Sequence, residues 1–176
     1  MPEALDEPVT LAPYDPAWPI AFAAERSRIC EALQLPQAAI EHIGSTAVPG
    51  LVAKPIVDLM LGVPLYPPPD TTVSRLVILG YRDMREAGVP GRRYLRLREK
   101  QSFNLHVVAR DGVHWANNLQ LREYLRRDSG ARERYVAAKE DAIAAGHRRL
   151  LAYSQAKQGI LATLATEADS APAKDT

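Results

Sequence analysis

The sequence predicts an α+β fold, and three groups of patterns lead to this expectation. A helical pattern at 17–34 follows Asp15 and Pro16, residue types that often begin helices. Strand patterns occupy the middle of the chain, at 38–45, 55–63, 93–99 and 102–109, and the last two are expected to form an antiparallel hairpin. Helical stretches at 114–127, 131–145 and 150–165 come last. An N-terminal helix and C-terminal helices are therefore expected to pack on a sheet, the last three covering one side of it.

The boundaries of these elements come from local signals. Pro36 is expected to end the first helix, and Thr71 or Thr72 is expected to cap a further helix that follows the proline-rich segment 64–70. The segment 166–176 is small, polar and proline-containing, which is typical of a mobile tail without a catalytic role. We therefore expect one domain over residues 1–165 and a flexible tail over 166–176.

The composition of the chain indicates which partners and which cellular compartment are expected. The 176 residues carry 22 Lys and Arg against 21 Asp and Glu, and this balance argues against nucleic acid as a partner. Neither a leader nor an apolar run of membrane-spanning length is visible, and Cys30 is the single cysteine. The sequence predicts a cytoplasmic protein without a membrane partner. An excess of basic residues over 113–157 marks the half of the chain that is more suited to an anionic ligand.

A turn at Gly44 and Ser45 is the first candidate site, and Thr46 follows it directly. It stands where a predicted strand ends, so that backbone N–H groups and a hydroxyl can face a phosphate while glycine permits close approach. Of the preceding pair, Glu41 and His42 point to opposite faces of their strand, and we favour His42 as the one that joins the pocket.

Asp58 is the second candidate because it stands inside the apolar strand 55–63. A carboxylate there must be paired, neutralised or bound to a cation. A salt bridge to Lys54 or to an arginine explains it as well as a metal or ligand role does. On the strand 102–109, Asn104 and His106 share one face. If that strand neighbours the first, Asp58 and His106 would supply an oxygen and a nitrogen ligand for a divalent ion, or a carboxylate that orients an imidazole.

Basic residues of the last helices complete the set of candidates. Tyr153 and Lys157 lie four residues apart, so they share a helix face and could close the pocket together with Arg122. Such a pair is also common on helices as packing plus a solvated charge.

The segments EHIGSTAVPGL, AKPIVDLML, NLHVV and AYSQAK resemble the GrpB-like family, which is assigned to the nucleotidyltransferase superfamily. The resemblance runs from about Val9 to Leu164. It implies a nucleotidyltransferase-like α+β fold with a mixed sheet. It further implies that Gly44 and Ser45 form the phosphate-contacting turn and that Asp58 is the first metal-binding acid.

The superfamily's second strand acid is replaced by Met60, and Asn104 and His106 stand where a third acid is expected. One carboxylate and one imidazole make a poor magnesium site, so two-metal nucleotidyl transfer is implied by the resemblance but weakened by the residues. Three readings remain. In the first, a metal-dependent enzyme uses Mg²⁺ or Mn²⁺ to transfer a nucleotidyl or phosphoryl group to a small acceptor. Ser45 would contact the phosphates, Lys54 or Arg122 would neutralise their charge, and Asp58 would bind the metal ion. His106 would be the second metal ligand or the general base. In the second, a binding module holds a nucleotide or another phosphorylated metabolite without catalysis. In the third, Asp58 and His106 only pair in the core.

Overall fold

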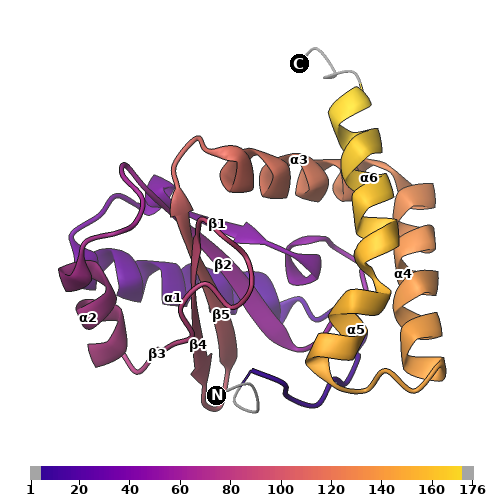
Figure 1. Ribbon diagram of the computed structural model, residues 1–176, viewed down its shortest axis with the longest axis horizontal. Coiled ribbons are helices and arrows are strands. Elements are labelled where there is room, and N and C mark those ends of the chain that lie inside the picture. The colour runs from indigo at the N-terminus through magenta and orange to yellow at the C-terminus, as the bar shows by residue number, and fades with distance from the viewer. Residues whose placement is uncertain (1–4, 172–176) are drawn as a thin grey trace.

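A five-stranded mixed sheet forms the centre of the molecule, with helices on both of its faces (Figure 1). The computed structural model describes residues 5–171. The strands are β1 (Ile40–Ile43), β2 (Ile56–Val63), β3 (Arg82–Asp83), β4 (Arg92–Arg98) and β5 (Ser102–Ala109), in the order β1-β2-β5-β4-β3. Strands β2 and β5 are parallel, and the other neighbours are antiparallel. The predicted α+β fold, the mixed sheet and the 93–109 hairpin are confirmed.

The helices divide between the two faces of the sheet. They are α1 (Ala17–Leu33), α2 (Asp70–Ile78), α3 (Val113–Arg127), α4 (Ser129–Ala144), α5 (Leu150–Ala156) and α6 (Gln158–Ser170), with short 3-10 turns η2 (Gln37–Ala39) and η3 (Ser45–Ala47). Helices α1 and α2 lie on one side, and α3 to α6 are grouped on the other (Figure 1). Within residues 5–171 no helix has the length and apolar character needed to cross a membrane.

Side chains alternate in direction along each strand, so the sheet has an apolar face and a polar face. Alternate residues of β2, β4 and β5, such as Leu59, Leu95 and Leu105, are buried in the large core against α1 and α2. The residues between them point the other way. On that second face the pairing of parallel β2 and β5 sets Asp58 beside Asn104, and the pairing of β4 and β5 sets Tyr94 beside His106. The polar strand residues thus gather under α3 to α6.

Of the predicted helix boundaries, the start of α1 is confirmed and the cap of α2 is not. The Asp15 carboxylate accepts a hydrogen bond from the Ala17 N–H at 2.8 Å, as predicted for α1. That helix ends at Leu33, because Gln34 adopts a left-handed conformation before Pro36 is reached. Helix α2 begins at Asp70 without a side-chain cap, so neither Thr71 nor Thr72 caps it.

The C-terminal region differs from the sequence expectation in two ways. The stretch 150–165 forms two helices instead of one, with Lys157 at the junction between α5 and α6. Helix α6 continues to Ser170, and Glu167 accepts hydrogen bonds from Tyr124 and Arg134. Thr166 to Ser170 are therefore helical and tied to α3 and α4, in contrast to the expected tail over 166–176. Residues 172–176 of that tail lie outside the described part of the chain. The two-residue edge strand β3 was not anticipated.

Candidate functional site

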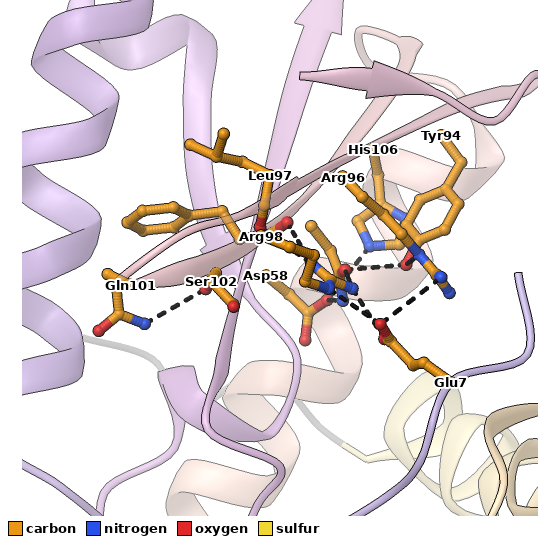
Figure 2. A network of polar contacts seen from close by, with 11 residues as sticks. Glu7, Asp58, Tyr94, Arg96, Leu97, Arg98, Gln101, Ser102 and His106 are labelled. Carbon is orange, nitrogen blue, oxygen red and sulfur yellow. Dashed lines mark hydrogen bonds and ion pairs between the residues drawn. The ribbon is translucent and has the colours of Figure 1, made fainter. Parts of the chain in front are cut away.

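Asp58 lies at the centre of the polar face of the sheet, and its side chain is 24% exposed. Its Oδ1 accepts a hydrogen bond from the Asn104 amide at 2.7 Å and lies 3.4 Å from Nε2 of His106. Figure 2 shows the carboxylate and the imidazole turned toward each other. Burial acts to raise the pKa of Asp58, but His106, Lys54 and Asn104 together outweigh it and hold this pKa below its usual value. The carboxylate is ionised at neutral pH.

The Asn104 side chain is fixed by three partners. Its amide group donates to Asp58, and its carbonyl oxygen accepts from the Tyr94 hydroxyl at 2.8 Å and from Arg98 at 2.8 Å. Arg98 also forms an ion pair with Glu7 at 2.8 Å, which ties the N-terminal segment to this network (Figure 2). Asn104 therefore orients Asp58, and its oxygen is already used within the protein.

The turn that follows β1 approaches Asp58 from the adjacent edge of the sheet. Ile43 pairs with Asp58 in the register of β1 and β2, and Gly44 then turns the chain with a φ of 71° into η3. The next residues hold the turn in place, since Val48 and Leu51 are buried in a second core formed with α3, α4 and α6. The VPGL segment thus anchors Ser45 between the sheet and the C-terminal helices.

Lys139 on α4 reaches into this turn from the opposite side. Its residue exposure is 2%, and its Nζ lies 2.6 Å from Oγ of Ser45 and 2.7 Å from the carbonyl oxygen of Val52. The amine also lies 4.2 Å from the centre of the Tyr135 ring. Burial, reinforced by the charge of Lys157, lowers the pKa of Lys139 to about 6.

Two further lysines converge on the same space. Nζ of Lys157 lies 4.2 Å from the centre of the Tyr153 ring, and burial lowers the pKa of this lysine to about 8. Burial also lowers the pKa of Lys54, while Asp58 acts in the opposite direction. Within residues 5–171, neither these two lysines nor Lys139 has a carboxylate oxygen within 4.0 Å. Asp58 acts to raise the pKa of all three amines, and Glu7 acts in the same direction on Lys54 alone.

Two cavities meet at Lys54 and Asp58. The smaller, of about 150 Å³, is the lysine pocket, lined by Gly44, Ser45, Thr46, Ala53, Lys54, Ile56, Asp58, Tyr135, Lys139, Tyr153 and Lys157. The larger, of about 540 Å³, is the strand pocket; its polar wall is formed by Lys54, Asp58, Arg92, Tyr94, Asn104 and His106. Residues of α5 and α6 and the loop at Ala87 to Val89 close the strand pocket on its other sides. A ligand that reaches through both would pass Asp58.

The donor set does not fit the magnesium centre that the family resemblance implies. Asp58 and His106 are the two candidate ligands, and within residues 5–171 no group of three or more His, Cys, Asp or Glu side chains is arranged to hold a metal ion. Met60 is fully buried against Ile43, Val108 and Trp115, so the second acid position is part of a small apolar cluster. A hard divalent cation needs more oxygen ligands than this site offers, and the neighbouring lysines oppose it.

Two of the expected site residues lie elsewhere. His42 is on the opposite face of the sheet from Asp58, where its ring stacks on Phe22 at 4.7 Å and its Nε2 lies 3.0 Å from the Thr46 hydroxyl. Burial lowers the pKa of His42 to about 4, so it packs as a neutral ring. This placement differs from the expectation that His42 joins the pocket.

Arg122 also lies outside both pockets. It pairs with Glu41 at 2.8 Å and donates to the carbonyl oxygen of His42. It lines a small cavity of about 40 Å³ together with Gly44 and Ser45. Arg122 therefore braces β1 and does not face the lysine pocket.

The remaining candidates are brought together. Gly44, Ser45, Lys54, Tyr153 and Lys157 line the lysine pocket, as does Thr46, whose hydroxyl is engaged by His42. Asn104 and His106 line the strand pocket.

Sequence reasoning missed Tyr135 and Lys139. A signal for them exists, because Tyr135 and Lys139 repeat the Tyr-x-x-x-Lys spacing of Tyr153 and Lys157. It also missed Arg92, which lies just before the predicted strand 93–99, and Tyr94, which was placed in that strand without a function.

Comparison with known proteins gives a consistent result over nearly the whole chain. Residues 8–167 match the family described as GrpB protein. The chain is 32% identical over 174 residues to a UPF0157 protein of Halalkalibacterium halodurans, a match that covers 92% of this chain and 83% of that one. It is 52% identical over 81 residues to a UPF0157 protein of Pseudomonas aeruginosa, covering 46% of this chain and 34% of that protein.

Among solved structures, the fold is similar to the crystal structure of conserved protein GrpB from Enterococcus faecalis. The TM-score is 0.79 at 30% sequence identity, and the match covers 90% of this chain and 96% of the other. The shared sheet and helices, together with the match over residues 8–167, agree with the resemblance seen in the sequence. This chain belongs to the GrpB protein family.

Proposed function

We propose that this protein binds a phosphorylated small molecule, with its phosphate groups in the lysine pocket and the rest of the molecule in the strand pocket. The observation that carries the proposal is the convergence of Lys54, Lys139 and Lys157 on one pocket, where Asp58 is the carboxylate that lines the wall. Phosphate oxygens are the natural counter-charge for such a group of amines and hydroxyls.

The charge balance of the lysine pocket supports an anionic ligand. Burial lowers the pKa of Lys139 to about 6 and that of Lys157 to about 8, so the free pocket favours release of protons from its own amines. A bound anion would reverse this effect, because an opposite charge nearby stabilises the protonated amine. Ligand binding and protonation of Lys157 therefore support each other, whereas Lys139, with the lower pKa, is the first of the two amines to lose its proton.

The strand pocket suits a planar group joined to the phosphate. Its volume of about 540 Å³ is within the range of small-molecule sites. The guanidinium carbon of Arg92 lies 4.8 Å from the centre of the Tyr94 ring, and the His106 ring lies 5.1 Å from the same ring. Aromatic and guanidinium surfaces of this kind stack against flat rings, which favours a nucleotide among phosphorylated metabolites.

Binding without two-metal catalysis is favoured over nucleotidyl transfer for this site. Asp58 is a single strand acid, Met60 is sealed beneath Trp115, and the oxygen of Asn104 is already hydrogen-bonded twice. Group transfer remains the second candidate because Asp58 lies where the two pockets meet, ionised and 3.4 Å from His106. In that reading the carboxylate and imidazole would accept a proton from an acceptor hydroxyl in the strand pocket.

Thermal unfolding of the purified protein with tripolyphosphate and with ATP tests the proposal, each with and without Mg²⁺. Both ligands are expected to stabilise the protein without metal, by about 2.7 kcal/mol at a concentration one hundred times Kd. Lys157→Met is expected to lose most of this stabilisation. Lys100→Met is the matched control, because Lys100 is exposed on the turn between β4 and β5.

The outcomes separate the two candidate functions. Equal stabilisation of the Lys157→Met variant and the wild type, or no stabilisation by either ligand, would overturn the binding proposal. Chromatography of the same ATP mixtures, with a panel of hydroxyl acceptors added, detects transfer. A product that forms in the wild type and disappears in Asp58→Asn would favour the enzyme.

A further inference from the structure

The contact between Lys139 and Ser45 has a geometry that anion binding alone does not require. Nζ of Lys139 is held by the carbonyl oxygen of Val52 at 2.7 Å and lies 2.6 Å from Oγ of Ser45. The Val52 carbonyl can only accept, so it takes one of the N–H groups of the amine and fixes the direction of the others. Ser45 is half-buried and lines the lysine pocket, and its side chain interacts with Tyr135 as well as with the amine.

The surroundings of Lys139 favour its neutral form. Lys54 and Lys157 repel a third positive charge, the Tyr135 ring covers the amine, and Asp58 is the opposing group. Lys139 is 2% exposed, and its amine has no carboxylate oxygen within 4.0 Å among residues 5–171. A neutral amine keeps a lone pair that can accept the hydroxyl proton of Ser45 while an N–H still donates to Val52.

We propose that Ser45 is a nucleophile and that Lys139 is its general base. The arrangement has the three parts of an activated serine: a hydroxyl, a base within hydrogen-bond reach of it, and a third group, the Val52 carbonyl, that orients the base. Lys54 and Lys157 line the same pocket and would balance negative charge that builds up on the electrophile. The class of electrophile, an anionic phosphoryl compound, rests on the proposed function above.

The covalent step is a substitution at phosphorus. Oγ of Ser45 forms a bond to the phosphorus atom, and the bond from phosphorus to the leaving-group oxygen breaks with its electron pair. The proton of the Ser45 hydroxyl passes to Nζ of Lys139 and from there to the leaving group. The products are a phosphorylated or nucleotidylated Ser45 and the released alcohol or phosphate, with no metal or redox partner consumed.

A fluorophosphonate probe tests the nucleophile separately from the ligand. With this probe the Oγ–P bond forms, the P–F bond breaks and fluoride leaves, so reaction needs the activated serine and no phosphate binding. Intact-mass spectrometry with peptide mapping is expected to show one adduct, on Ser45, which is absent in Ser45→Ala. Ser154, an exposed serine that lines the strand pocket, is the internal control and is expected to stay unmodified.

The role of Lys139 is tested by rate and by pH. Lys139→Met is expected to slow labelling about 100-fold or more, the usual range for loss of a general base. The wild-type rate is expected to rise with pH through an apparent pKa of about 6 and then to level, which does not depend on whether the variant folds. A rate that is flat from pH 5 to 8, or an adduct that persists in Ser45→Ala, would overturn the assignment.

Failure of this proposal and failure of the binding proposal give different results. If tripolyphosphate stabilises the wild type but the probe labels no residue, the pocket binds anions and Ser45 is not a nucleophile. If the probe labels Ser45 but tripolyphosphate neither stabilises the protein nor slows labelling, the nucleophile stands and the phosphorylated ligand class is wrong.

Discussion

Gly44 lies so close to Asp58 that a side chain at position 44 would meet the carboxylate. A Cβ built on Gly44 would be 2.7 Å from Oδ2 of Asp58, well inside van der Waals contact, and the backbone there has a φ of 71°. Both constraints favour glycine. The close approach also places the Ser45 turn directly over the carboxylate, so this contact defines the wall where the lysine pocket meets Asp58.

Gly44→Ala is therefore expected to do more than strain the backbone. The positive φ alone should lower the free energy of unfolding by on the order of 1 to 3 kcal/mol. The contact with Asp58 should lower it further and should also weaken the stabilisation by tripolyphosphate. Gly50→Ala is the matched control, because Gly50 has a φ of 78° with nothing within 4 Å of its Cβ position. Chemical denaturation measures both variants. Equal losses of unfolding free energy in the two variants would show that the contact with Asp58 adds no destabilisation.

Asn104→Asp is expected to create a metal site that the wild type lacks. The new carboxylate would face Asp58 at the place where the amide now donates at 2.7 Å, and two carboxylates so close favour a divalent cation between them. Mn²⁺ alone should raise the Tm of the variant and leave that of the wild type unchanged. Without metal the variant should be less stable, because the two negative charges repel.

A thermal shift of the wild type with Mn²⁺ alone would contradict the conclusion drawn from the donor set. Asn104→Leu serves as a control for loss of the amide, since it removes the hydrogen bond to Asp58 without adding a charge. It should be destabilised without any gain in response to Mn²⁺.

The stability of the ligand-free protein is expected to rise with pH from about 6.5 to 9. Lys139 and Lys157 have folded pKa values of about 6 and about 8, below the ordinary lysine value of 10.5. Between the folded and unfolded values the unfolded chain binds more protons, so raising the pH favours the folded state. The cost of these buried amines is thus greatest at low pH and declines as pH rises toward 10.5.

Denaturation in a buffer without phosphate or sulfate measures this slope, which approaches about 1.4 kcal/mol per pH unit for each such lysine. Lys157→Met should flatten the slope between pH 8 and 9, and Lys100→Met should not. Added sulfate should stabilise the protein most at the low end of the range, because it favours the protonated amines. A flat profile would show that the lysines are solvated, because their folded and unfolded pKa values would then be equal.

Much of the fold could be read from the chain because its signals are local. The period of two in the strand 102–109, the capping carboxylate of Asp15 and the Gly44-Ser45 turn depend on neighbours within a few residues, and all are found as expected. The extension of α6 to Ser170 was missed because packing of Ala168 against α3 and α4 outweighs the weak helix propensity of that segment. The break at Lys157 was missed as well.

The candidate site divides in the same way. The sequence by itself determined that Gly44, Ser45 and Asp58 are polar or turn-forming positions in an apolar region. A charged residue within an apolar strand can be recognised without knowing its neighbours in space. Only the tertiary structure decided that Lys139 is buried against Ser45, 94 residues away, and that His42 faces the opposite side of the sheet. A helical lysine such as Lys139 has the same sequence pattern whether its face meets water or another element, and only packing removes it from solvent and shifts its pKa.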